Sequence, residues 1–174
     1  DLTYNGSAKT ATISGYPASA PTGLAAEPTT ITYYASTGAG STATSGEALT
    51  GAPSAAGDYV AQMTWGEQTA SMAFSIGKAN ITPSVSITGW TYGDTANTPS
   101  VTGNGSVSYS YSGREGTTYG PSADVPTLAG DYTVTATVAA TDNYGEGTAT
   151  ANFTIAKKTV TVSGITAESK TYDG

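Results

Sequence analysis

The chain repeats itself, because three sequence markers occur in the same order twice and the first of them returns at the end. The first marker holds a Thr-Tyr pair before a turn dipeptide, the second a Gly-Asp-Tyr turn, and the third a Phe-x-Ile segment closed by Lys. They lie at residues 2–6, 90–94 and 170–174, at 53–60 and 126–133, and at 74–78 and 153–157. Such self-similarity constrains the architecture before any local signal is considered.

The spacing of the markers predicts the domain organisation. The markers recur after about 80 residues, which exceeds the 20–50 residues of a solenoid repeat and suffices for a small domain with its own core. We therefore predict a first domain over residues 1–78, a second over 79–157 and the opening strand of a third over 158–174. The linkers between them are very short, which favours a semi-rigid tandem array.

Alternation of apolar and polar residues predicts strands along the whole chain. Residues 132–138 alternate strictly, and residues 31–33, 59–65, 107–112 and 159–162 show comparable patterns. One face of the first of these would hold Tyr132, Val134, Ala136 and Val138. No segment of ten or more residues keeps a helical period, and turn dipeptides separate the apolar runs. The predicted fold class is all-β, with tandem Ig-like β-sandwich domains.

The core of each domain is predicted to be small and rich in aromatic residues. Leu, Ile, Val and Phe are scarce, whereas the chain holds twelve Tyr and two Trp. These rings supply the large buriable area that the aliphatic residues do not. The low aliphatic content alone would indicate disorder, but the regular alternation argues against that interpretation.

The net charge and the short apolar runs argue against two classes of partner. The net charge is −7, and only 11% of the residues are charged. Nucleic-acid phosphates require a basic surface, so we expect no nucleic-acid partner. No run of apolar residues is long enough to cross a bilayer, so we expect no membrane insertion.

The absence of His and Cys closes the common catalytic routes. A His-based triad, a thiol nucleophile and a His/Cys zinc site are all excluded. The thirteen carboxylates are scattered through turns and single out no glycosidase pair. We therefore expect no enzyme and no cofactor. Calcium stays an alternative at residues 142–146, where two acids and an amide share a turn, although a plain turn is favoured.

The first unit differs from the others at its start. Residues 81–90 predict a strand before the Tyr marker of the second unit, and residues 159–169 predict one in the third. Only residues 1–3 precede Tyr4 in the first unit, whose opening strand is therefore missing. The favoured interpretation is a window from a longer tandem array. The alternative is donor-strand exchange, in which the tail strand of one subunit completes the first unit of the next.

The most specific local motif is Ala-Gly-Asp-Tyr, at residues 56–59 and 129–132. Gly57 and Gly130 would turn the chain with positive φ, and Tyr59 and Tyr132 would then enter a strand with their rings inward. A buried Tyr needs a partner for its hydroxyl group, as in the tyrosine corner of Ig-like sandwiches. A structural role is favoured over a ligand-binding one.

A family resemblance follows from these motifs. The Lys-Thr-Tyr-Asp-Gly marker at 170–174, the Pro-x-x-Ala-Gly-Asp-Tyr turn and the closing Phe-Thr-Ile-Ala-Lys resemble the YDG and MBG domain repeats of bacterial surface proteins. The likeness covers essentially the whole chain, although the first copy has Asn5-Gly6 and the second Gly93-Asp94 at the turn. The resemblance implies an Ig-like module of a large secreted or wall-attached protein, and it brings no characterised catalytic site.

Two further kinds of site are considered. Trp65, Trp90, Tyr109 and Tyr111 are candidates for stacking on sugar rings if they are exposed, and are core residues if they are buried. A Lys–Asn isopeptide bond has candidates in Lys9, Lys78, Lys157 and Asn152, but it also needs a buried acid beside it.

The expected function is that of a non-catalytic spacer. We expect an extracellular stalk or structural segment of a bacterial surface protein or surface fibre, whose partners are neighbouring repeats or identical subunits arranged head to tail. One alternative is an adhesin module that binds glycans or surface proteins of host or microbial origin. Another is a filament subunit that assembles by donation of the tail strand.

Overall fold

The computed structural model describes residues 2–15, 22–23, 30–166 and 169–173. The chain divides into two compact units. Unit 1 comprises Asp1–Pro83, Gly103–Val107 and Thr137–Thr148, and unit 2 comprises Ser84–Thr102, Ser108–Ala136 and Ala149–Gly174. Every regular element of the described residues is a strand, so the all-β prediction is confirmed. With no helix in this part of the chain, none is long and apolar enough to cross a membrane.

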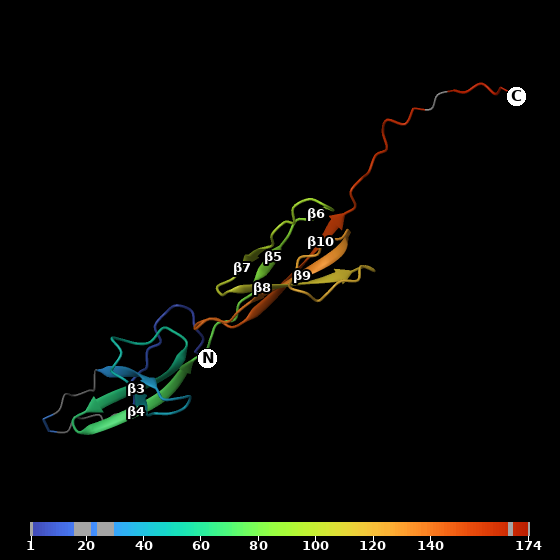
Figure 1. Ribbon diagram of the computed structural model, residues 1–174. Helices are drawn as coiled ribbons and strands as arrows, with labels where there is room; N and C mark the ends of the chain where they lie inside the picture. The colour runs from blue at the N-terminus through green and yellow to red at the C-terminus, as the bar shows by residue number, and fades with distance from the viewer. Residues whose placement is uncertain (1, 16–21, 24–29, 167–168, 174) are drawn as a thin grey trace. The chain divides into compact units, whose positions relative to one another are not determined.

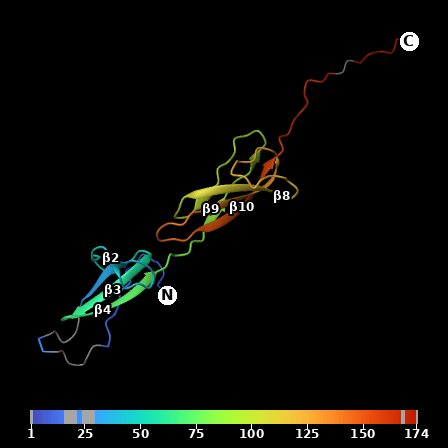
Figure 2. The same ribbon diagram turned by 60° about the horizontal axis from the view of Figure 1, so that its bottom comes forward.

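Unit 1 contains one antiparallel sheet, in the order β2-β1-β3-β4 (Figures 1 and 2). Its strands are β1 (Ile31–Ser36), β2 (Thr44–Ser45), β3 (Gly57–Trp65) and β4 (Gln68–Ile76). The β3–β4 hairpin pairs continuously from Gly57↔Ile76 to Trp65↔Gln68. Its turn includes Gly66 at φ +61°, a conformation that favours glycine. The buried apolar residues of this sheet are Tyr33, Val60, Ala61 and Ile76.

Unit 2 contains two sheets, except for a few residues at the ends of three strands. The larger has the order β6-β10-β9-β8, and the smaller pairs β5 with β7 in antiparallel register at Val85↔Val101 (Figure 1). The strands are β5 (Ser84–Ser86), β6 (Trp90–Thr91), β7 (Ser100–Thr102), β8 (Val107–Arg114), β9 (Gly130–Val138) and β10 (Gly147–Ala156). The ends of β8, β9 and β10 belong to unit 1.

The core of unit 2 lies on the inner face of the larger sheet. Its buried residues are Tyr111, Tyr132, Val134, Phe153 and Ile155. Strand β9 buries every second residue, and the four residues expected to share a face are all buried. The prediction of that strand and its inward face is therefore confirmed. The strands predicted at 31–33, 59–65 and 107–112 are also confirmed.

The predicted strand over 81–90 is wrong in its continuity, because it forms two short strands, β5 and β6, with residues 87–89 between them. The side chain of Asn97 explains part of the break. Its Nδ2 donates hydrogen bonds to the carbonyl oxygens of Thr88 and Gly89, at 3.0 and 3.2 Å. These carbonyls are thus satisfied by a side chain in place of a neighbouring strand.

The strand predicted over 159–169 is not formed in its described part, because residues 159–166 and 169 lie in no strand. Residues 167–168 lie outside the described residues. In Figure 1 this segment leads away from β10 as a thin trace. Val160 and Val162 are 88% and 81% exposed. An alternating sequence needs a neighbouring strand to pair its backbone groups, and no described residue supplies one here.

We predict that Gly89→Ala destabilises unit 2 by about 1–3 kcal/mol. A Cβ atom at this position would fall against the carbonyl oxygen of Thr154 in β10, closer than real Cβ atoms approach such a group. Urea unfolding measures the loss. Gly38→Ala is the matched control, because a Cβ there meets nothing within 4 Å. Equal stabilities of the two variants would contradict the close packing of this segment on β10.

Candidate functional site

In unit 1, residues 2–4 are bonded to the residue that follows β4. Thr3 forms a parallel bridge with Gly77, the residue after β4. The Gly77 amide donates to the carbonyl oxygen of Leu2 at 2.7 Å, and the Tyr4 amide donates to the carbonyl oxygen of Gly77 at 2.8 Å. The Thr-Tyr marker is therefore held beside the end of the final strand of the unit.

Unit 2 contains the same arrangement. Strand β6 pairs in parallel with the end of β10, with Ile155 opposite Trp90 and Ala156 opposite Thr91. The Tyr92 amide donates to the carbonyl oxygen of Ala156 at 2.8 Å. Tyr4 and Tyr92 occupy the same place in the repeated Thr-Tyr marker. Repeated sequence positions therefore form repeated hydrogen bonds.

This pairing has a mechanical consequence. Both segments of a parallel pair run in the same direction. Tension applied at the two ends of such a unit pulls one segment backward and the other forward. The hydrogen bonds between them are then loaded together in shear, whereas an antiparallel pair pulled from one end opens bond by bond.

The two Gly-Asp-Tyr turns place a tyrosine hydroxyl on a backbone carbonyl. Tyr59 Oη donates to the carbonyl oxygen of Ala55 at 3.0 Å, and Tyr132 Oη donates to that of Leu128 at 2.8 Å. In both turns the acceptor lies four residues before the tyrosine. Each hydroxyl thereby gains the partner that a ring packed into a core requires.

The two glycines of these turns act in different ways. Gly57 has φ +155°, within the range that favours glycine. The prediction of positive φ is wrong for Gly130, which is absent from the positive-φ residues of the structure. Close approach explains the glycine there, because an added Cβ would lie 2.8 Å from Thr117 and 3.3 Å from Tyr132 Oη.

Burial of the tyrosine rings changes their acidity. Desolvation raises the pKa of Tyr132 above its ordinary value, and the nearby Tyr119 adds to the effect. Desolvation likewise raises the pKa of Tyr111, with smaller contributions from Tyr109 and Tyr119. The pKa of Tyr59 is raised by desolvation and then by the Asp58 carboxylate. All three shifts favour the neutral hydroxyl that donates or packs in the folded state.

Three of the four candidate stacking residues come together in unit 2, around Phe153. Trp90 stacks on the Phe153 ring at 5.1 Å, and Tyr111, which is 2% exposed, meets that ring edge-on at 6.1 Å. Tyr109 is partly buried against the same core. Trp65 ends β3 in unit 1. These are the contacts of core residues, and a sugar platform stays a prediction.

The turn considered for calcium makes contacts within unit 1 that the sequence did not indicate. The Ala56 amide donates to Asn143 Oδ1 at 2.9 Å, and the Tyr144 ring meets Tyr4 edge-on at 5.3 Å. Lys78 Nζ donates to the carbonyl oxygen of Thr141 at 2.6 Å. Within the described ranges, no three His, Cys, Asp or Glu side chains gather as a metal site. No sequence signal links Ala56 to Asn143, because they are far apart along the chain.

Three of the four isopeptide candidates, Lys9, Lys78 and Asn152, make ordinary hydrogen bonds. Lys9 Nζ donates to Asn5 Oδ1 at 2.9 Å on the surface. Asn152 Oδ1 accepts from Thr133 Oγ1 at 2.7 Å. The described residues include no buried charged side chain of the kind that such a bond needs beside it.

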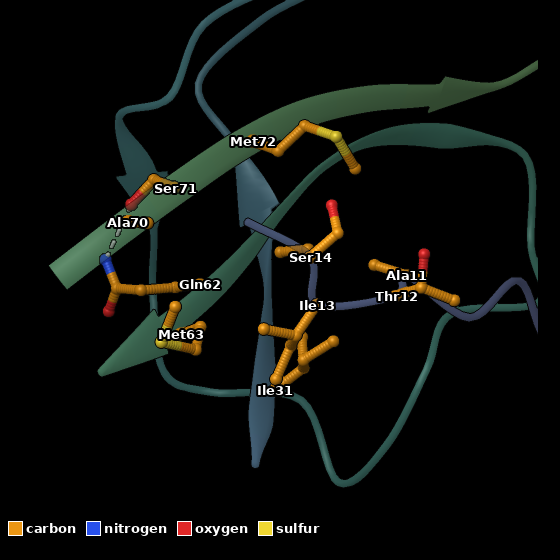
Figure 3. Close-up of a pocket in the computed structure, with 11 residues that line it drawn as sticks. Ala11, Thr12, Ile13, Ser14, Ile31, Gln62, Met63, Ala70, Ser71 and Met72 are labelled. Carbon is orange, nitrogen blue, oxygen red and sulfur yellow. Dashed lines mark hydrogen bonds between the residues drawn. The ribbon is translucent and has the colours of Figure 1, made fainter. Parts of the chain in front are cut away.

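A groove opens on unit 1 beside the β3–β4 hairpin (Figure 3). Its volume is about 170 Å³, close to that of apolar cavities that accept one small aromatic molecule. The lining comes from residues 11–14, from Ile31, and from facing parts of β3 and β4. Met72 of β4 is 53% exposed at its edge. The groove is therefore an open, uncharged surface of unit 1.

No family model, curated protein or solved structure matches the chain.

We predict that Tyr132→Phe lowers the free energy of unfolding by about 0.5–1.5 kcal/mol at neutral pH, because the bond to Leu128 is lost. In the native chain the folded-state pKa of Tyr132 is raised, so above the ordinary value of 10.0 the unfolded state loses its proton first. Stability from this group is full below that pH and is lost as pH rises through the folded-state pKa. The gap between native and variant should therefore shrink above pH 10.

Urea titrations from neutral pH to about pH 11 test this expectation. Tyr92→Phe is the matched control, since the Tyr92 ring is 47% exposed and should change stability little. A gap that stays constant with pH would contradict the role assigned to the buried hydroxyl.

Proposed function

We propose that the chain is a non-catalytic, load-bearing segment of an extracellular bacterial surface protein, built from tandem Ig-like β-sandwich modules. The all-β sheets and the recurrence of the three markers support this architecture. The resemblance of the markers to YDG and MBG repeats supports the extracellular, structural setting. The lack of His and Cys in the sequence supports a non-catalytic role.

One observation carries the mechanical part of the proposal: the Thr-Tyr marker pairs in parallel with the chain at the end of β4 in unit 1 and at the end of β10 in unit 2. In unit 1 this pairing joins residues 2–4 to Gly77, and in unit 2 it joins residues 90–92 to the end of β10. When tension reaches the marker and the end of β4 or β10, the chain enclosed between them can extend only after these bonds shear. Each unit then keeps its folded length up to a threshold tension, which is what a stalk requires.

The turn tyrosines recur at the same place in both repeats, and their contacts support the same function. Tyr59 and Tyr132 enter the central strands β3 and β9, and each ties the preceding turn to its own strand through the hydroxyl group. The turn therefore cannot separate from the strand without loss of a hydrogen bond. This contact lies within one unit and needs no ligand.

We predict that single-molecule stretching of the chain gives two separate unfolding events. Each should release about 3.6 Å for every residue enclosed between the paired segments. Tyr92→Pro removes the amide that bonds to Ala156 and should lower the unfolding force of unit 2 alone.

Tyr92→Ala is the matched control, because it removes the same exposed ring and keeps the amide. A proline variant that unfolds at the same force as the alanine variant would refute the shear mechanism. Continuous extension without a force peak would refute the load-bearing function as a whole.

A further inference from the structure

Units 1 and 2 can be aligned without a gap over eight residues after the Tyr marker. Residues 8–15 read Ala-Lys-Thr-Ala-Thr-Ile-Ser-Gly, and residues 96–103 read Ala-Asn-Thr-Pro-Ser-Val-Thr-Gly. Both segments lie at the same distance from their marker tyrosine. Ile13 therefore corresponds to Val101, the central residue of β7.

In unit 2 this segment has a partner. Strand β7 pairs with β5, and Val85 and Ile87 of the partner segment pack against the core. Trp90, which follows in the chain, stacks on Phe153 of the same core. The segment before the Thr-Tyr marker of unit 2 therefore covers one face of this core.

In unit 1 the corresponding segment has no strand partner within the described residues. Residues 12–14 carry no strand assignment, and they line the groove of Figure 3 together with β4. Met72 of β4 corresponds to Ala151 of β10 by its place before the Phe-x-Ile marker. Ala151 is packed against the core, whereas Met72 is 53% exposed. The groove thus lies where β5 lies in unit 2.

One residue pair records the difference. Gly147 of β10 has no room for a side chain, because an added Cβ would lie 2.8 Å from Ile81 and from Pro83. Its counterpart in β4 is Gln68, which is exposed.

The lining of the groove combines apolar side chains with uncharged polar ones. Figure 3 shows Ile13, Ile31 and Met63 gathered on one side, with Met72 reaching in from β4. All lining residues are uncharged. An uncharged, extended segment with apolar residues on one face would fill such a groove without burying a charge.

The chain contains such a segment in residues 159–166, which carry no charge. Val160, Val162 and Ile165 are each more than 80% exposed. Val160 and Val162 share a strand face. Gly164 has φ +81°, the conformation of a glycine bulge, and one bulged residue brings Ile165 onto that face as well. Ile165 stands as far before its marker tyrosine as Val85 does before Tyr92.

We propose that the groove of unit 1 binds residues 159–166 of a second copy of the chain as an added antiparallel strand, with Ile165 opposite Ile13. The proposal rests on the sandwich modules of the proposed function and is independent of their load-bearing role. The tail and the groove are different surfaces, so the contact is heterologous and propagates head to tail. Backbone hydrogen bonds along residues 12–14 give affinity, and the apolar face gives register.

Cysteine cross-linking tests the register directly, because the native chain has no cysteine. In the variant Ile13→Cys/Ile165→Cys, oxidation should give a ladder of disulfide-linked dimers and larger oligomers, since opposed residues of paired strands lie within disulfide reach. The matched control Ile13→Cys/Thr166→Cys places the second thiol on the opposite strand face and should give little ladder. An equal ladder in both variants, no ladder, or a disulfide within one chain would overturn the proposal.

A second experiment needs no new thiol. Val160→Asp/Val162→Asp should weaken self-association at least about tenfold in light scattering, because a charged face cannot enter the groove. Thr161→Asp adds a charge on the other face and should retain association. The tail belongs to no sheet, so circular dichroism should show both variants folded.

The two proposals fail separately. A native chain that stays monomeric at every concentration overturns strand addition and leaves the stretching experiment unaffected. A native chain that associates equally with and without the Val substitutions also overturns it. Loss of the unfolding force peaks in a chain that still forms the disulfide ladder overturns only the load-bearing function.

Discussion

The packing of rings around Phe153 is the interaction on which unit 2 depends. Phe153 of β10 stacks on Trp90 of β6 and on Tyr132 of β9, and it meets Tyr111 of β8 edge-on. Phe153 thereby contacts one ring from each of the three remaining strands of the larger sheet. In a chain with few aliphatic side chains, these aromatic contacts supply the buried area that Leu and Ile supply elsewhere. Unit 1 repeats the plan in reduced form, with Phe74 against Tyr33 and Tyr59.

The reduction in unit 1 has a local cause. Phe153 is 5% exposed beneath the segment that precedes the Thr-Tyr marker of unit 2, whereas Phe74 is only partly buried. The same sheet plan is thus present with one face closed in unit 2 and open in unit 1. Backbone pairing at the chain ends does not differ in this way, since both units keep the parallel bonds at the Thr-Tyr marker. The backbone pairing at the Thr-Tyr marker is therefore independent of whether the core of the unit is covered.

Local pattern was sufficient for the strands and insufficient for their partners. The alternation in β9 predicted its buried face, because strand geometry sends successive side chains to opposite sides. The same pattern at 159–162 predicted a strand that is not formed, because pairing depends on a neighbour that the pattern does not specify. The break before Gly89 depends on the amide of Asn97, and the position of Ala56 on that of Asn143. Such contacts between distant residues follow from the fold, and single-sequence patterns do not report them.

The placement of the two tryptophans gives the molecule an internal optical label. The chain has two Trp, and one falls in each unit: Trp65 at the end of β3 and Trp90 in β6. Trp90 stacks on Phe153, so its indole emission responds directly to the integrity of that core. Replacing either tryptophan by phenylalanine leaves a single tryptophan, whose indole emission reports on one unit. The melting of the open sheet and of the closed one can thus be followed separately in the intact chain, without any added dye.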